Sequence, residues 1–126
     1  DFIKSVLETL GAVEAVDESK LNAVTGISGS SPAYFYLFAK SIIEAGVKYG
    51  LDYDACKNLV VHTMIGSGKM ILSNQDKTLD ELINAVCSKG GTTLEAMKVF
   101  NEKELNKLVD EAVEHCIKRA GELENL

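Results

Sequence analysis

The stretch "SPAYFYLFAKSIIEAGVKYG", residues 31–50, decides the fold of this chain. It is apolar around most of a helical circumference, and a single narrow polar stripe is formed by Lys40, Glu44 and Lys48. We expect Ser31 to cap this helix, because a proline at the first helical position gives up no needed N–H, and Gly50 to end it. The pattern predicts a helix over residues 32–49.

A second long segment of the same kind follows, "YDACKNLVVHTMIGSGKMILS", with Asp52 as its predicted N-terminal cap. Helices that are apolar on most faces must be buried on more than one side. A single domain of 126 residues cannot cover the helices at 32–49 and 53–72 by itself. We therefore expect a homodimer, and a higher oligomer is left open.

The rest of the chain is also predicted to be helical, apart from its first residues. Capping-box spacing marks three further helix starts, and the last helix spans "ELNKLVDEAVEHCIKRAGEL". The three pairs are Thr78 with Glu81, Thr92 with Glu95, and Asn101 with Glu104. "GISGSS", residues 26–31, is interpreted as a turn that leads into a helix cap. Residues 2–10 predict a short amphipathic helix, and the alternation in "AVEAV", residues 12–16, predicts a strand.

Composition excludes several classes of protein. The net charge of −6 argues against nucleic acid or an anionic membrane surface as the main partner. Cys56, Cys87 and Cys116 have no disulfide or metal spacing, so we expect no metal and a reducing, cytoplasmic location. No apolar run is long enough to span a bilayer. The start "DFIKSVLETLG", without an initiator methionine, suggests a piece of a longer polypeptide.

Familiar catalytic and nucleotide-binding motifs are incomplete in this sequence. "GSGKM", residues 66–70, lacks two positions of a P-loop and the third glycine of a dinucleotide fingerprint, and its small residues suit close approach of another helix. His62 and His115 have no partner at triad or metal spacing and are interpreted as core or surface residues. Cys87 is interpreted as a packed thiol. We expect no cofactor site within this chain.

"SKGGTT", residues 88–93, is the motif that suggests a ligand. Its two glycines leave the backbone open, and a helix starting at Thr92 would present free N–H groups and its positive dipole end to a carboxylate or phosphate. Ser88 and Thr93 add hydroxyl donors, and Lys89 adds a charge. The same residues fit an ordinary glycine turn followed by a threonine cap. The chemistry of these residues alone does not favour one interpretation over the other.

Two separated motifs resemble one enzyme family. "AVTGISGSSPAYFYLFAKSIIEAGVKYGL" together with "LINAVCSKGGTTLEAMKVF" is similar to the C-terminal domain of pyrroline-5-carboxylate reductase, over about residues 18–126. The likeness rests on S-G-x-x-P-A-Y, at Ser28, Gly29, Pro32, Ala33 and Tyr34, and on V-x-S-x-G-G-T-T, at Val86, Ser88, Gly90, Gly91, Thr92 and Thr93. The sequence departs from the family at Lys89, where proline is usual, and at Ser31, where glycine is usual.

The resemblance implies a two-domain oxidoreductase that reduces 1-pyrroline-5-carboxylate to L-proline, the last step of proline biosynthesis. An N-terminal Rossmann domain would bind NADPH or NADH, with no metal. The fold implied here is all-α, a helical dimerisation domain of the 6-phosphogluconate dehydrogenase C-terminal-like type with interlocked helices. Residues 1–17 would be a helix–strand remnant of the Rossmann domain, and residues 18–126 the dimerisation and substrate-binding domain. This chain alone would be inactive.

The resemblance also implies the site residues. Ser88, Gly90, Gly91, Thr92 and Thr93 would bind the substrate carboxylate, and the Thr93 hydroxyl would lie beside the ring nitrogen as the catalytic group. Two alternatives are left open. One is a stand-alone helical oligomerisation module without an active site, and the other is a related imine or β-hydroxyacid dehydrogenase domain.

Overall fold

The computed structural model describes residues 2–124, and throughout that range the regular structure is helical, with no strand. In chain order the α-helices are α1 (Phe2–Glu8), α2 (Leu21–Val24), α3 (Ser31–Lys48), α4 (Tyr53–Ser73), α5 (Leu79–Val86), α6 (Thr92–Glu102) and α7 (Leu105–Leu123). A 3-10 turn, η1 (Glu18–Lys20), precedes α2, and a π-helix, η2 (Thr25–Gly29), joins α2 to α3. The predicted all-α fold class is confirmed.

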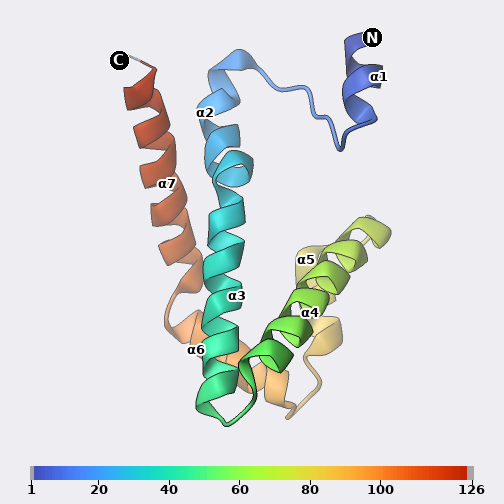
Figure 1. The fold of residues 1–126 in the computed structure, drawn as a ribbon, viewed down its shortest axis with the longest axis vertical. Coiled ribbons are helices and arrows are strands. Elements are labelled where there is room, and N and C mark those ends of the chain that lie inside the picture. The colour runs from blue at the N-terminus through green and yellow to red at the C-terminus, as the bar shows by residue number, and fades with distance from the viewer. Residues whose placement is uncertain (1, 125–126) are drawn as a thin grey trace.

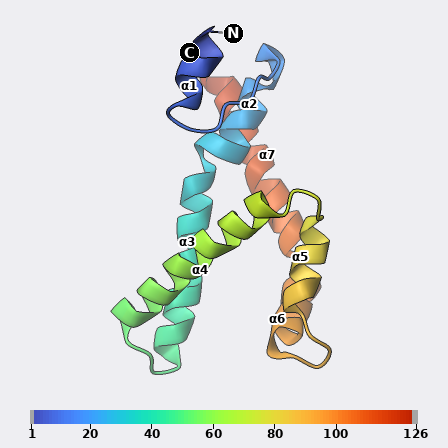
Figure 2. The same cartoon turned by 90° about the vertical axis from the view of Figure 1, so that its right-hand side faces the viewer.

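The helices form an open arrangement with two arms (Figure 1). The first arm is a continuous column of α2, η2 and α3, and α7 runs antiparallel beside it, packed on α2 and η2. At the foot of α3 the chain reverses into α4, which packs on α3 and then diverges from it. After a turn of 90°, α5 and α6 are seen together at one side (Figure 2). In Figure 1, α1 stands apart at the end of an extended segment.

The α3–α4 hairpin follows its sequence signals. After α3, Gly50 takes φ +90°, a left-handed conformation that glycine adopts without strain. Asp52 then caps α4, because its Oδ2 accepts from the backbone N–H of Ala55 at 3.0 Å. The two helices approach closely at Gly46, where a Cβ would lie 2.7 Å from the Sγ of Cys56. Both long helices are therefore confirmed, with the predicted stop and the predicted cap between them.

Little of this chain is buried within itself. Among the described residues, the buried apolar positions are Ala39, Ile43 and Cys56. The accessible surface is 10618 Å², whereas a compact monomer of 13.6 kDa would expose about 6,600 Å². Side chains of α3 remain bare, with Tyr36 72% and Leu37 65% exposed. Apolar surface exposed on this scale marks an interface.

The opening of the chain differs from the prediction. Its first helix is present but ends at Glu8, two residues before the predicted end. The strand predicted at 12–16 is wrong for this chain, since residues 12–17 have no regular structure. A strand is held by backbone hydrogen bonds to a neighbouring strand, and no strand exists among residues 2–124 to supply them.

The turn predicted at residues 26–31 is also wrong, because the π-helix η2 extends to Gly29 and α3 already begins at Ser31. The backbone N–H of Ser30 donates to the carbonyl of Thr25 at 2.9 Å, a bond across five residues that defines a π-helix. Gly26 is buried there, and a Cβ on it would lie 2.9 Å from Cγ1 of Ile117 in α7. The glycine therefore serves close helix packing rather than chain reversal.

Of the capping boxes predicted from the sequence, the one at Thr78 is confirmed. Its Oγ1 accepts from the backbone N–H of Glu81 at 3.2 Å, and the Glu81 carboxylate accepts from the backbone N–H of Thr78 at 2.7 Å. The caps predicted at Ser31, Thr92 and Asn101 are wrong, because each of these residues lies inside a helix.

Local geometry explains two of these differences. At the start of α6 the extended residue Gly91, with φ −80° and ψ 160°, occupies the N-cap position, and the carboxylate of Glu95 pairs with Lys98 at 2.6 Å instead of reaching back. Asn101 lies in the last turn of α6, and α7 begins only after Glu104, which has φ 53°. The spacing of Asn101 and Glu104 therefore coincides with a break between helices rather than with a cap.

Candidate functional site

The ligand motif predicted at residues 88–93 forms a tight turn between α5 and α6. The backbone N–H of Gly91 donates to the carbonyl of Ser88 at 2.9 Å, which closes a four-residue turn. Gly90 has φ +72°, whereas Lys89 is not among the residues with positive φ. This combination defines a type II turn, with Lys89 at its second position and Gly90 at the third, where glycine is favoured.

Gly91 sets the position of the Ser88 hydroxyl. A Cβ on Gly91 would overlap Ser88 Oγ and would lie 3.1 Å from the Ser88 carbonyl oxygen. The hydroxyl therefore rests against the bare Cα of Gly91, next to the N-terminal end of α6. A residue with a side chain at this position would displace that hydroxyl.

The N-terminus of α6 is open to an acceptor. Its N-cap residue is Gly91, which has no side chain with which to cap the helix. The N–H groups of the first turn, including those of Thr92 and Thr93, have no acceptor within the helix, and they lie at the positive end of its dipole. A carboxylate placed here could accept from these N–H groups and from the adjacent Ser88 hydroxyl.

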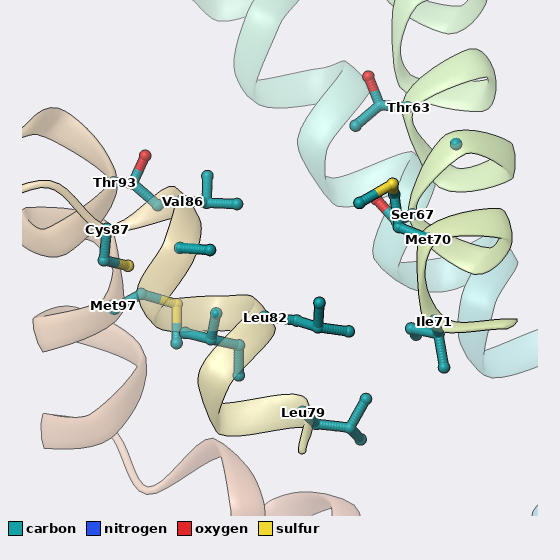
Figure 3. A pocket seen from close by; sticks show the side chains of 13 residues that line it. Thr63, Ser67, Met70, Ile71, Leu79, Leu82, Val86, Cys87, Thr93 and Met97 are labelled. Atoms are coloured by element: carbon teal, nitrogen blue, oxygen red, sulfur yellow. The ribbon is translucent and has the colours of Figure 1, made fainter. Parts of the chain in front are cut away.

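Thr93 also lines an apolar groove of about 700 Å³ between α4, α5 and the start of α6. Figure 3 shows Thr93, Cys87 and Met97 at one side of this groove, with Thr63 and Ser67 of α4 on the other. The lining residues are Thr63, Gly66, Ser67, Met70, Ile71, Leu79, Leu82, Ile83, Ala85, Val86, Cys87, Thr93 and Met97. Three hydroxyls and one thiol are the polar side-chain groups among them, so a group bound beside Thr93 would have largely apolar surroundings.

The structure brings most of the predicted site residues together. Ser88 and the two glycines meet in the turn, and Thr93 faces the groove, whereas Thr92 is exposed at the first position of the helix. Sequence reasoning missed the contribution of α4, from Thr63 and Ser67. Their spacing of four residues places both on one face of a helix, and that signal was present in the sequence.

The two histidines lie at positions that are weaker candidates for a site among the described residues. The ring Nδ1 of His62 lies 2.8 Å from the carbonyl oxygen of Asn58 in its own helix. His115 lines a shallow hollow on α7 with Leu108, Glu111 and Ala112. Residues 2–124 contain no group of His, Cys, Asp and Glu side chains that could hold a metal ion. Within the same residues no helix is long and apolar enough to cross a membrane.

Long helices with exposed apolar faces, and a tight turn before an uncapped helix N-terminus, characterise this all-helical domain. Residues 18–123 match the family model described as pyrroline-5-carboxylate reductase dimerisation. The chain belongs to this family, which confirms the resemblance found in its sequence.

Curated relatives carry the same family description. Pyrroline-5-carboxylate reductase of Haemophilus influenzae is 37% identical over 126 residues, an alignment that covers 99% of this chain and 46% of the relative. Pyrroline-5-carboxylate reductase 2 of Bacillus subtilis is 34% identical over 120 residues, covering 95% of this chain and 43% of the relative. The chain thus spans somewhat less than half the length of these relatives.

Solved structures show the same fold. A pyrroline-5-carboxylate reductase from Coxiella burnetii matches with a TM-score of 0.92 and 30% identity, over 97% of this chain and 45% of that one. A pyrroline carboxylate reductase from Plasmodium falciparum, solved with NADP bound, matches with a TM-score of 0.85 and 32% identity, over 94% of this chain and 45% of that one.

Proposed function

We propose that this chain is the dimerisation and substrate-binding domain of a pyrroline-5-carboxylate reductase, which reduces 1-pyrroline-5-carboxylate to L-proline with NADPH or NADH. The observation that carries the proposal is the turn at residues 88–91, which places a serine hydroxyl at the uncapped N-terminus of α6. A cyclic imine that bears a carboxylate is the kind of ligand this arrangement fits, since it has one anionic group to anchor and one ring nitrogen to face Thr93.

In this proposal, residues of the chain itself bind and orient the substrate and assist its protonation. The Ser88 hydroxyl and the first amides of α6, next to Gly91, hold the substrate carboxylate through charge-assisted hydrogen bonds. The Thr93 hydroxyl, on the groove side of the same turn, lies beside the ring nitrogen and assists its protonation. The nicotinamide cofactor, when bound, supplies the hydride that adds to the C=N carbon.

The division of labour within the complete enzyme follows from this assignment. Residues 18–126 belong to the helical domain, and residues 1–17 belong with the cofactor-binding domain. The lack of regular structure in residues 12–17 and the isolated position of α1 in Figure 1 support this boundary. The NADP named for the Plasmodium falciparum relative supports a nicotinamide cofactor. The free cysteines suit a reducing compartment such as the cytoplasm.

A second copy of the chain completes the fold in this proposal. The accessible surface of 10618 Å² exceeds that of a compact monomer by about 4,000 Å². Obligate homodimers bury about 2,000–5,000 Å² in total, so two such surfaces are ample to cover one another. The bare faces of α3 and the wall of α4 at Gly66 and Gly68, where a Cβ would meet no atom within 4 Å, are the places for a partner helix.

Steady-state kinetics of Thr93 variants tests the proposed site in the complete polypeptide that carries this chain. Thr93→Ala should lose a hydrogen bond to the substrate, worth about 1.5–3 kcal/mol, and kcat/KM should fall about tenfold to hundredfold. Thr93→Ser keeps the hydroxyl and should retain most of the activity. A stand-alone oligomerisation module, the alternative without an active site, predicts no reductase activity in the parent protein to lose.

A further inference from the structure

Three groups that the proposed reaction does not use meet where α7 crosses the junction of η2 and α3. The thiol of Cys116 in α7 donates to the hydroxyl oxygen of Ser30 at 3.2 Å. The hydroxyl of Tyr34, one turn further along α3, is shielded from solvent and has no hydrogen-bond partner. We call Cys116, Ser30 and Tyr34 the thiol cluster.

The thiol cluster is arranged to stabilise a thiolate. A buried hydroxyl without an acceptor carries an unmet desolvation cost. Ionisation of Cys116 would supply a charged acceptor to both hydroxyls at once. In agreement with this geometry, the hydrogen bond with Ser30 lowers the pKa of the Cys116 thiol, and the neighbouring Cys116 raises the pKa of Tyr34.

The other two cysteines lack this environment. Cys56 is only 4% exposed and is packed against Gly46 at the α3–α4 crossing. Cys87 is half-buried, as Cys116 is, but it lies in the wall of the apolar groove. Cys116 and Cys87 are therefore both half-buried but differ in the hydrogen-bonding groups around them. Cys87 can serve as an internal control for Cys116.

We propose that Cys116 is the reactive thiol of this chain and a modification site for small disulfides such as oxidised glutathione. The thiolate sulfur attacks one sulfur of the disulfide, and a new S–S bond forms as the old one breaks. The second glutathione leaves as a thiolate and takes up the proton that Cys116 released to solvent. One disulfide is consumed and one is formed, so no further oxidant is needed.

The position of Cys116 gives the modification a structural consequence. The next residue, Ile117, fills the space above Gly26, where a Cβ would come within 2.9 Å. An adduct on Cys116 would therefore lie beside this close contact between α7 and η2. The adduct on Cys116 should therefore loosen α7 from the column of α2, η2 and α3, and the modified protein should unfold at a lower temperature than the reduced protein.

The test measures the alkylation rate of each cysteine with iodoacetamide, and mixed-disulfide formation with oxidised glutathione, by peptide mass spectrometry on the folded protein. Cys116 should react several-fold faster than Cys87 and much faster than Cys56 with either reagent. Ser30→Ala and Tyr34→Phe should each slow the reaction of Cys116 by about two- to tenfold, the range covered by one hydrogen bond. The rate at Cys87 should stay unchanged in both variants.

Cys56 reports whether a variant remains folded, because only opening of the α3–α4 crossing exposes it. If Ser30→Ala raises the reaction rate of Cys56, that variant is unfolded. The proposal is then tested with Tyr34→Phe and with the rates of Cys116 and Cys87 in the unaltered chain. The proposal is overturned if Cys116 reacts no faster than Cys87. It is equally overturned if both variants keep the buried Cys56 rate and leave the rate at Cys116 as it was.

Discussion

Gly91→Ala gives the sharpest view of how the turn before α6 is built. The backbone of Gly91, with φ −80° and ψ 160°, is one that alanine adopts without strain. The new Cβ would overlap Ser88 Oγ, while the Ser88 carbonyl oxygen at 3.1 Å needs to move by only a few tenths of an ångström. The substitution should therefore act mainly by turning the Ser88 hydroxyl away from the helix N-terminus.

The expected magnitude follows from that displacement. A hydrogen bond from a hydroxyl to a carboxylate is worth about 1.5–3 kcal/mol, so kcat/KM of the complete enzyme should fall about tenfold to hundredfold in Gly91→Ala. The free energy of unfolding should change by less than about 1 kcal/mol. Gly90→Ala is the matched control. Nothing lies within 4 Å of a Cβ there, but φ is +72°, so its main effect should be a loss of stability of about 1–2 kcal/mol.

A double-mutant cycle separates this account from general damage to the loop. In a Ser88→Ala background the overlapping oxygen is absent, so adding Gly91→Ala should lower kcat/KM little further. The assay is steady-state oxidation of NADPH with 1-pyrroline-5-carboxylate, together with thermal unfolding of each variant. If the two substitutions are additive, or if Gly91→Ala retains full kcat/KM, the assigned role of the Ser88 hydroxyl is wrong.

Three further predictions concern stability and are read from unfolding curves. Lys89→Pro, at the second position of a type II turn, should stabilise the protein by about 0.4–1 kcal/mol, and an unchanged or lower midpoint would contradict the turn assignment. Thr78→Ala should cost about 1 kcal/mol. Backbone and hydroxyl hydrogen bonds from Thr78 lower the pKa of Glu81, so the stability they contribute is present above the unfolded-state pKa of Glu81 and is lost as the pH falls. In Thr78→Ala, the free energy of unfolding should therefore decrease less steeply with falling pH. Gly46→Ala should cost about 1–3 kcal/mol by overpacking against Cys56, and a neutral result would show that the two long helices do not cross there.

Much of the fold could be predicted because its signals are local. The continuous apolar character of the two long helices, the stop at Gly50 and the cap at Asp52 each depend on a few neighbouring residues, and the structure confirms all of them. The capping box at Thr78 belongs to the same kind of signal. Local backbone rules were sufficient in these places because no distant segment competes with them.

The sequence predictions and the structure differ where a non-local contact or a neighbouring glycine determines the local structure. Gly26 looked like a turn residue, but it is the point at which Ile117 of α7 packs, and tertiary contact keeps that segment helical. Thr92 carries the spacing of a cap, yet the extended Gly91 before it takes the cap position. The strand at 12–16 has the right alternation but no partner strand among the described residues.

The candidate site was predictable in part. The glycine pair and the hydroxyls of Ser88 and Thr93 could be recognised in the sequence, because a turn that leads into a helix N-terminus is a local arrangement. The side of the groove formed by Thr63 and Ser67 could not be placed, because it depends on how α4 diverges from α3. The overlap that makes Gly91 necessary also required the geometry of the folded turn.

Sedimentation equilibrium of the isolated chain tests most directly the claim that a second copy covers the bare faces of α3 and α4. The chain has a mass of 13.6 kDa. At micromolar concentration the predicted species is a folded dimer of twice that mass, or a multiple of it, and helical structure should be lost as dilution dissociates it. A stable, fully helical monomer of 13.6 kDa across the whole concentration range would contradict the account.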